Sequence, residues 1–306
     1  MWISDKWTDY EVLDASDGEK LERFGDYLLI RPDPQVIWKT NKKPIWKNVN
    51  AHYHRSSKGG GSWEFFSLPE EWQISYRDLT FRLKPFRFKH TGIFPEQACN
   101  WDFADAMIRK RINEGGEVRL LNLFAYTGGA TLSAAAAGAK VTHVDASKGM
   151  VTWAKENAAV SGLKDAPIRY LVDDCVKFVD RELRRGNSYE AIILDPPSYG
   201  RGPGGEVWKM EEMIYRFLVK CCLLMSDEPL FILLNSYTTG LQPAVISCLL
   251  QTAMDTALSS KQDMMAPDAV KRFRQGKTIS EEICLPISGS RLVLPCGACG
   301  RWIPGQ

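Results

Sequence analysis

VRLLNLFAYTGGATLSAAAAGAKVTHVDAS, residues 118–147, is the stretch that decides the fold. Residues 118–124 form an apolar run typical of a buried strand, and Gly128 with Gly129 predicts a tight turn. An alanine-rich segment follows, and a second apolar strand over 140–144 ends at Asp145. Strand, glycine turn, small-residue helix and a second strand with an acidic end together indicate a nucleotide-cofactor fold.

The turn and Asp145 also predict the kind of cofactor. Glycines let the backbone approach a ligand, and a carboxylate at the end of the second strand accepts hydrogen bonds from ribose hydroxyls. The dinucleotide fingerprint G-x-G-x-x-G is absent from the stretch. We therefore expect an adenosyl ligand without phosphate rather than a nicotinamide dinucleotide.

Two later strand ends carry acids as well. IRYLVDD, residues 168–174, ends in Asp173 and Asp174, which could accept from an adenine amino group or cap the following helix. AIILDPPSYG, residues 191–200, is an apolar strand running directly into an Asp-Pro-Pro turn. Two prolines fix the backbone and withhold two N–H groups, so carbonyls and the Asp195 carboxylate remain as acceptors. Such a turn suits an amino group that is being methylated.

The rest of the chain after residue 90 alternates helices and strands. Residues 200–208, GRGPGGEVW, are a glycine-rich loop that either orders on substrate binding or stays a disordered surface loop. Helices are expected over 207–225 and 243–258, with a buried strand over 229–237 between them. Two short strands with a turn at 288–290 follow as an antiparallel hairpin. The pattern predicts an α/β domain over residues 91–306.

Residues 1–90 differ from that pattern and predict a small, mainly β domain. Alternating apolar and polar residues with many aromatics fill 63–88, after a GGGS turn at 59–62. Between Gln35 and Lys58 there are six basic residues and no acid, interleaved with Trp38, Trp46 and Tyr53. Stacking aromatics beside cations suit single-stranded RNA. The other interpretation is a solvated hairpin whose aromatic side chains pack inward.

Composition sets further limits. The formal net charge of +2 decides nothing about nucleic acid. Eight cysteines in a chain with no apolar signal segment behind Met1 predict reduced thiols and a cytoplasmic location. No apolar run approaches the roughly 20 residues that cross a bilayer, so no membrane role is expected. Cys296 and Cys299 form CGAC, but a zinc site needs about four ligands, so no metal is expected. The oligomeric state stays open.

The motifs NLFAYTGG, HVDAS, DD and LDPPSYG follow one another in an order that resembles class I S-adenosylmethionine-dependent methyltransferases over residues 88–300. The chain is most similar to the bacterial 23S ribosomal RNA methyltransferase family. The resemblance implies a Rossmann-like sheet of seven strands, mostly parallel with a C-terminal antiparallel hairpin. It also implies S-adenosyl-L-methionine as cofactor and RNA as substrate.

The resemblance further assigns site residues. The turn would surround the methionine part of the cofactor, Asp145 would hold the ribose, and a segment before residue 98 would cover the cofactor. The cofactor-binding candidates are Thr91, Phe94, Gln97, Asn122, Phe124, Ala125, Tyr126, Thr127, Gly128, Gly129, Asp145, Ala146, Ser147, Asp173, Asp174 and Asp195. The catalytic candidates are Asp195, Pro196, Pro197 and Tyr199. The substrate-binding candidates are Ser198, Arg201, Ser236 and Tyr237.

One departure from the family pattern bears on the reaction. Cytosine-C5 methyltransferases of this family need a cysteine nucleophile after the fifth strand, where this chain has Asn235, Ser236 and Tyr237. A nitrogen target, or an oxygen, needs no covalent intermediate, and we expect methylation of an RNA nitrogen. Enzymes that methylate amino groups usually carry an aromatic residue fourth in the motif; here it is Ser198, with Tyr199 next. The alternatives are methylation of a small molecule or protein, a non-catalytic RNA-binding protein that holds the cofactor, and a nicotinamide-dependent oxidoreductase.

Overall fold

The computed structural model describes residues 1–56, 60–86, 89–202 and 204–305. Lys58 and Gly59, part of the basic segment and of the GGGS turn, lie outside the described residues, as do residues 87–88 of the expected strand region and Pro203 of the glycine-rich loop. The chain forms two compact units. The first comprises residues 1–99, 159–161 and 283–296, and the second comprises 100–158, 162–282 and 297–306.

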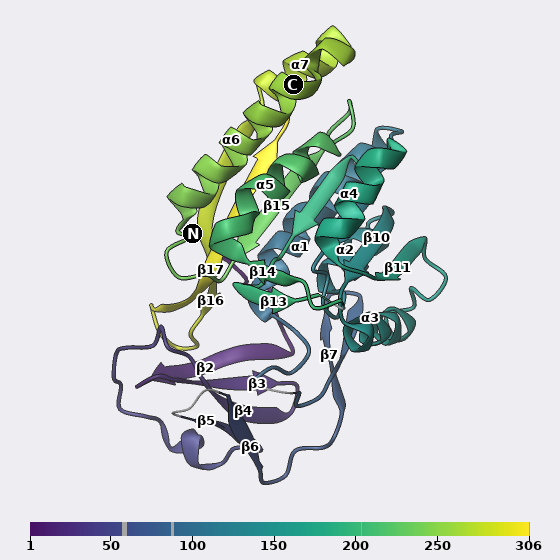
Figure 1. Ribbon diagram of the computed structural model, residues 1–306. Helices are drawn as coiled ribbons and strands as arrows, with labels where there is room; N and C mark the ends of the chain where they lie inside the picture. Colours follow the sequence, from purple (N-terminus) through teal and green to yellow (C-terminus); the bar gives the residue numbers. More distant parts are fainter. Residues whose placement is uncertain (57–59, 87–88, 203, 306) are drawn as a thin grey trace. The chain divides into compact units, whose positions relative to one another are not determined.

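The first unit is mainly β (Figure 1). One five-stranded sheet has the order β2-β3-β4-β5-β6, and a separate hairpin joins β7 and β8. Their bounds are β2 Tyr10–Ser16, β3 Glu19–Phe24, β4 Tyr27–Pro32, β5 Ala51–Arg55, β6 Gly61–Phe65, β7 Trp72–Tyr76 and β8 Leu79–Leu83. Two 3₁₀ turns, η1 Pro44–Lys47 and η2 Pro95–Gln97, also belong to this unit.

The basic segment of the first unit does not present its aromatic residues for stacking. Trp46 and Tyr53 are buried, and the Trp46 indole N–H donates to Asp14 Oδ2 at 2.8 Å. The Trp38 indole N–H donates to the Ala15 carbonyl at 3.0 Å. Lys42 lies over the Trp46 ring and pairs with Glu19. The inward-packed interpretation is therefore correct for Trp46 and Tyr53, whose buried rings cannot stack on a base, while Trp38 is half-buried with its indole N–H bonded inside the unit.

The second unit is built on a mostly parallel sheet flanked by helices (Figure 1). The strand order is β16-β17-β15-β12-β9-β10-β11, the seven strands expected, and the short β1 Trp2–Ile3 pairs with β16 at its outer edge. The strands are β9 Arg119–Leu123, β10 Lys140–Asp145, β11 Ile168–Val172, β12 Ala191–Leu194, β15 Phe231–Ser236, β16 Lys277–Pro286 and β17 Val293–Ile303. Five are parallel, and β17 is antiparallel to β15.

Helices cover both faces of this sheet. They are α1 Ala98–Asn113, α2 Gly129–Ala136, α3 Lys148–Val160, α4 Cys175–Arg185, α5 Met210–Leu223, α6 Pro243–Lys261 and α7 Pro267–Arg274, with a 3₁₀ turn η3 Gln262–Met264. Side chains of α4, α5 and α6 share one apolar core with β9, β12 and β15. Thr131 of α2 instead bonds to Asn122 and His143, which lie on the opposite face. Among the described helices, none has both the length and the apolar character needed to cross a bilayer.

Two elements depart from the sequence expectations. The ends of the glycine-rich stretch are strands: β13 Tyr199–Arg201 and β14 Val207–Lys209 form an antiparallel hairpin on either side of it, and α5 starts only after the hairpin, at Met210. The helix α7 was not expected, because basic and apolar residues alternate there over only eight positions. Pro267 at its first turn is the signal that could have located it.

Candidate functional site

The acidic strand ends gather at one edge of the sheet. The strands β15, β12, β9, β10 and β11 are neighbours in this order and run parallel, so their carboxyl ends meet there. The direction of the chain's crossovers changes between β9 and β12, which is where ligands bind in open α/β sheets. The turn after β9 and the Asp-Pro-Pro segment after β12 lie on either side of that point.

The turn after β9 has an unusual backbone. Phe124 and Tyr126 both have positive φ angles, 56° and 50°, although neither is glycine. Side chains rarely adopt this conformation, and it persists where surrounding structure enforces it, often at functional sites. The Phe124 N–H donates to Cys175 Sγ at 3.3 Å, and the Tyr126 N–H donates to Asp145 Oδ2 at 2.9 Å. The turn is thus held by the end of β10 and by the first residue of α4.

Asp145 connects the turn with the start of α3. Its second oxygen, Oδ1, accepts from the Ser147 N–H at 2.8 Å. Desolvation raises the pKa of this carboxyl above its ordinary value, against the two N–H groups that lower it. Because both N–H donors are neutral and each carboxylate oxygen can accept further bonds, the group can still receive hydroxyl donors. These acceptor oxygens fit the ribose hydroxyls of an adenosyl cofactor.

The two turn glycines have separate packing reasons. Gly128 has a φ of 90°, and a Cβ there would lie 3.0 Å from the Ala154 Cβ of α3. A Cβ on Gly129 would lie 2.5 Å from Trp101 of α1, so α2 approaches α1 closely only because this residue is glycine. The Asn157 side chain of α3 donates to the Thr127 carbonyl at 2.9 Å. These contacts place the start of α2 with its N–H groups at the sheet edge.

Asn122, a cofactor-binding candidate, lies below this edge. It is buried in β9, and its amide donates to Thr131 Oγ1 at 2.9 Å. The same hydroxyl is 2.9 Å from His143 Nδ1. Burial lowers the pKa of His143 to about 3, so the imidazole is neutral. Asn122, Thr131 and His143 therefore join α2 to β9 and β10.

The acids after β11 have structural partners. Asp174 is the N-cap of α4, where its Oδ1 accepts from the Lys177 N–H at 2.9 Å. Asp173 forms an ion pair with Arg181. The helix-capping alternative is thus confirmed for Asp174, and the adenine contact stays a prediction for both acids.

The Asp-Pro-Pro segment and the end of β15 face each other across neighbouring strands. Asp195 begins the segment, and its N–H donates to the Leu123 carbonyl at 3.3 Å. Ser198 Oγ lies 2.7 Å from Thr238 Oγ1, which joins the two strand ends. Ser236 is buried and its hydroxyl accepts from the Thr238 N–H, whereas Tyr199 and Tyr237 are 54% and 37% exposed. Two aromatic rings thus stand at the surface of this edge.

Sequence reasoning missed Trp208 of β14. Its indole N–H donates to the Pro197 carbonyl at 2.7 Å, and its ring lies 5.1 Å from the Phe124 ring. Only its aromatic type, within a stretch otherwise rich in glycine, could have marked it as a buried anchor. Arg201, by contrast, is exposed in β13, and its guanidinium donates to the Tyr199 hydroxyl at 3.4 Å.

Three cofactor candidates belong to the first unit. Thr91 and Gln97 are buried there, and Phe94 packs edge-to-face against His90. No described residue bonds to the Thr91 hydroxyl, an orphaned buried donor of the kind that a ligand can satisfy. Their contact with the cofactor remains a prediction.

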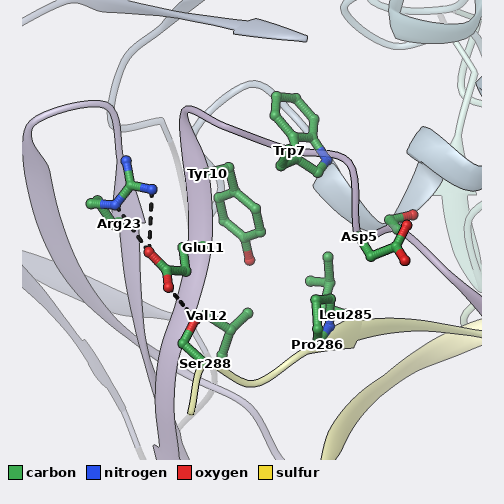
Figure 2. Close-up of a pocket in the computed structure, with 10 residues that line it drawn as sticks. Asp5, Trp7, Tyr10, Glu11, Val12, Arg23, Leu285, Pro286 and Ser288 are labelled. Atoms are coloured by element: carbon green, nitrogen blue, oxygen red, sulfur yellow. Dashed lines mark hydrogen bonds and ion pairs between the residues drawn. The ribbon is translucent and has the colours of Figure 1, made fainter.

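A cavity of about 310 Å³ in the first unit is a weaker candidate site (Figure 2). Trp7, Tyr10 and Asp5 line it beside a chain of paired polar groups. Arg23 donates to Glu11, and Glu11 in turn accepts from Ser288 (Figure 2). Because these charges already satisfy one another, the cavity offers a ligand few groups that would favour binding.

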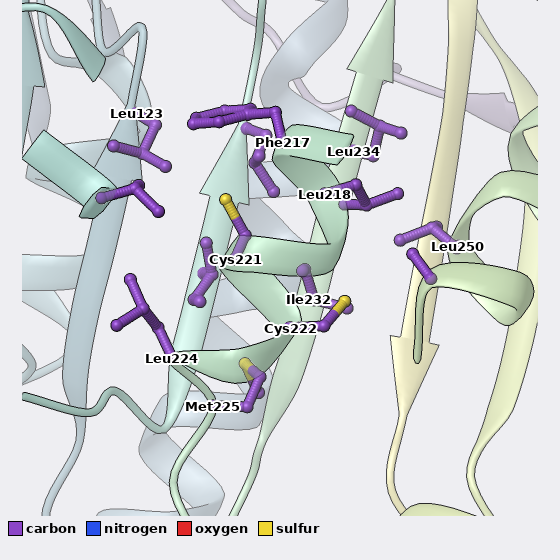
Figure 3. Packing of buried hydrophobic residues seen from close by; sticks show 14 of the residues in the cluster. Leu123, Phe217, Leu218, Cys221, Cys222, Leu224, Met225, Ile232, Leu234 and Leu250 are labelled. Carbon is purple, nitrogen blue, oxygen red and sulfur yellow. The ribbon is translucent and has the colours of Figure 1, made fainter. Parts of the chain in front are cut away.

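The cysteines of the second unit are largely withdrawn into its core. Cys221 and Cys222 of α5 are fully buried among leucines and Met225 (Figure 3). Burial raises the pKa of Cys222 to about 12, and it raises those of Cys221 and Cys175 well above their ordinary value. In the described part of the chain, no three His, Cys, Asp or Glu side chains group in a way that could hold a metal.

The family model for S-adenosylmethionine-dependent methyltransferases matches residues 44–241, about two thirds of the chain. The chain belongs to this family. The methyltransferase fold is shared with a solved SAM-dependent methyltransferase from Agrobacterium tumefaciens, which is 34% identical with a TM-score of 0.84. The match covers 97% of this chain and 91% of that one. A second structure, complexed with S-adenosylhomocysteine (SAH), shares the fold at 17% identity and a TM-score of 0.69, over 98% and 76% of the two chains.

The curated relatives of this methyltransferase include "Ribosomal RNA large subunit methyltransferase K/L" of Pseudoalteromonas atlantica, 27% identical over 72% of this chain. A protein of the same name from Shewanella frigidimarina is 35% identical over 39% of the chain. The matches cover 34% and 16% of those two relatives, so the chain spans only about a third and about a sixth of their length. Membership of the family makes S-adenosylmethionine the cofactor of this methyltransferase.

Proposed function

We propose that this methyltransferase transfers a methyl group to a nitrogen of ribosomal RNA, directly and without a covalent cysteine intermediate. The names of the curated relatives support the substrate class. The observation that carries the nitrogen target is the pair of acceptors after β12. The Asp195 carboxylate stands there, and the Pro197 carbonyl is already bonded to Trp208, which leaves the Pro196 carbonyl as the second acceptor.

Two acceptors side by side suit an amino group, which has two N–H donors. In this proposal, Asp195 and the Pro196 carbonyl each accept one of these hydrogen bonds and turn the nitrogen lone pair toward the donor. The bound cofactor supplies an activated methyl group on a sulfonium. The nitrogen–carbon bond forms as the sulfur–carbon bond breaks, and the surplus proton leaves along the bond to Asp195. The chain's part is alignment and exclusion of water.

The remaining site residues would hold the cofactor and the base. Asp145 would bind the ribose hydroxyls, the turn from Phe124 to Gly129 would surround the methionine part, and Asp173 or Asp174 would face the adenine. Tyr199 and Tyr237 are exposed at this edge, which favours stacking on a base. Ser198, Arg201 and Ser236 would complete the acceptor site.

The state of the thiols supports direct transfer. A cysteine nucleophile must reach the thiolate, and burial holds the pKa values of Cys175, Cys221 and Cys222 high. The positions next to the acceptor site are Ser198 and Ser236, whose hydroxyls bond to Thr238. A ring carbon that needs covalent activation is therefore the less suitable target.

The test is transfer of a labelled methyl group to RNA from cells that lack the enzyme, followed by nucleoside analysis. Asp195→Ala should lower transfer by about 100-fold or more, because an oriented acceptor is lost. Its affinity for SAH should stay within about threefold, because cofactor contacts lie mainly on β9 and β10. Asp165→Ala, which removes an exposed acid far along the chain, is the matched control and should change neither quantity.

Three results would contradict the proposal. Label appearing in protein or metabolite extracts but not in RNA would point to the alternative substrates. A methyl group on carbon or on a ribose oxygen would overturn the nitrogen target. Normal turnover by Asp195→Ala would mean that the acceptor site lies elsewhere.

A further inference from the structure

The side chain of Trp208 contacts both halves of the site. Its indole N–H donates to the Pro197 carbonyl at 2.7 Å. Pro197 belongs to the Asp-Pro-Pro motif, residues 195–197, which is called the acceptor segment below. Its ring lies 5.1 Å from the ring of Phe124, the residue with positive φ that opens the cofactor turn. Phe217 of α5 closes the cluster at 5.5 Å from Trp208 and 5.9 Å from Phe124. The side chain is 6% exposed, so the arrangement is a packed one.

The β13–β14 hairpin, which carries Trp208, packs closely against the acceptor segment. Gly200 is the register partner of Trp208, and a Cβ on Gly200 would lie 3.3 Å from the Pro197 Cγ. The Met210 N–H donates to the Ser198 carbonyl at 3.0 Å, just beyond the hairpin. Pro197 is exposed, but both Gly200 and Trp208 of the hairpin contact it, with a further backbone bond beside it.

These contacts restrict the directions of the carbonyl groups in the acceptor segment. If the carbonyls of Pro196 and Pro197 both faced the acceptor site, they would compete for the same amino group. The bond from Trp208 turns the Pro197 carbonyl toward β14, so the peptide plane between Pro197 and Ser198 is fixed. Because two consecutive prolines leave little freedom in φ, fixing this plane restricts the direction of the Pro196 carbonyl as well.

We infer that Trp208 is a positioning residue for methyl transfer, which holds the acceptor segment at a set distance and direction from the cofactor turn through its indole N–H and its ring. It does not contact the reacting atoms. Its loss should therefore lower the rate of the chemical step while the cofactor still binds. This inference rests on the proposed placement of the acceptor beside Asp195.

The test compares two identical substitutions in the second unit. Trp208→Phe keeps an aromatic ring and removes the N–H donor. Trp302→Phe is the control, because Trp302 is fully buried and its indole N–H has no hydrogen-bond partner among the described residues, so the substitution removes no bond that the structure shows. Trp208→Phe should lower kcat about 10-fold, since small displacements at a reacting centre are costly. KM for S-adenosylmethionine and the affinity for SAH should stay within about twofold, and Trp302→Phe should leave kcat near wild type.

Hydrogen exchange gives a measurement that needs no acceptor substrate. Peptides that cover residues 198–210 should exchange faster in Trp208→Phe, because the hairpin loses its hydrogen bond to the Pro197 carbonyl. Trp302→Phe should leave their exchange unchanged. Gly200→Ala perturbs the same contact from the other side and should lower kcat by a smaller factor. These comparisons hold even if Trp208→Ala fails to fold.

The outcomes separate this inference from the proposed function. If Asp195→Ala is inactive while Trp208→Phe keeps more than half of the wild-type kcat, the proposed site stands and the role of Trp208 is wrong. Equal losses of kcat in Trp208→Phe and Trp302→Phe would also overturn it, because they would indicate a general effect on packing. Full activity of Asp195→Ala would instead refute the acceptor site itself.

Discussion

Two carboxylates, one in each unit, have pKa values that are shifted in opposite directions. Glu22 of β3 is fully buried and accepts from Arg31 Nε at 2.6 Å and from the Tyr10 hydroxyl at 2.7 Å, with Lys20 at 3.5 Å. Asp145 of β10 accepts instead from two backbone N–H groups, those of Tyr126 and Ser147. The pKa of Glu22 is lowered to about 2, chiefly because Arg31 and Lys20 outweigh desolvation, whereas desolvation raises the pKa of Asp145.

The difference distinguishes a structural carboxylate, Glu22, from one that we propose binds the cofactor, Asp145. Cations satisfy Glu22 completely, so nothing is left for a ligand, and its role is to join β3 to β4. Asp145 is bonded to neutral N–H groups, with no cation paired to it among the described residues, which suits its lone pairs to hydroxyl donors of the cofactor in the proposed site. Perturbation of a pKa alone does not mark a site; its direction and its cause do.

The largest expected effect in this comparison is on stability, from Glu22→Gln. Removing one partner from a buried ion pair leaves Arg31 without its countercharge, which typically costs about 3–5 kcal/mol. We expect this loss in the free energy of unfolding, measured by denaturant titration with far-ultraviolet circular dichroism. The affinity of the folded protein for SAH should be within about twofold of wild type, because the Asp145 site is untouched.

Acid provides the control for Glu22→Gln. A carboxyl with a lowered folded pKa stabilises the protein above its unfolded pKa, and this contribution is lost as the pH falls toward the folded value. The gap in stability between wild type and Glu22→Gln should therefore narrow between about pH 4.5 and the folded pKa of about 2. A gap that stays constant over this range would show that the charge of Glu22 is not what stabilises the unit.

The next effect concerns binding, from Asp145→Asn. Charged hydrogen bonds are worth about 1.5–3 kcal/mol each, so loss of the charge should weaken SAH binding by about 10- to 100-fold in calorimetry. Stability should fall by about 1 kcal/mol, because the single amide oxygen accepts only one of the two N–H bonds that the two carboxylate oxygens now share, while a desolvated charge is removed at the same time. A large loss of stability with unchanged affinity would make Asp145 a second structural carboxylate and end the contrast.

The contrast also explains what the sequence could predict. The parallel sheet and the order of its motifs follow from apolar runs that end in Asp145, Asp174 and Asp195, since strand periodicity and strand ends are local signals. The hairpin around Trp208 could not be predicted, because the reason for its two short strands is a contact with Pro197 and Phe124. The glycines that suggested a loop are in part a steric requirement, as Gly200 against Pro197 illustrates.

The ion pairs of Glu22 could not be predicted from the sequence either, because they also depend on contacts between separate strands. In the sequence, Lys20, Glu22 and Arg31 are ordinary charged residues of alternating strands, and only the pairing of β3 with β4 brings them together. The aromatic residues of the basic segment misled in the opposite direction. The segment around Trp46 has the composition of a stacking surface. In the structure, however, the Trp46 side chain is buried, because it bonds to the carboxylate of Asp14 and packs against Leu21 and Ile30.

The smallest expected effect tests an acid that could belong to either class, Asp174. Its side chain caps α4, and replacing a capping Asp by Ala costs about 1 kcal/mol of stability, whereas Asn caps about equally well. Asp174→Ala should therefore lower the midpoint of thermal unfolding by a few degrees, and Asp174→Asn should not. If Asp174 also receives the adenine amino group, both variants should bind SAH a few-fold more weakly than wild type, since Asn retains the cap but loses the charge. Unchanged affinity in Asp174→Asn would assign this residue to the structural class with Glu22, and Asp173 would then be the acid to test at the adenine.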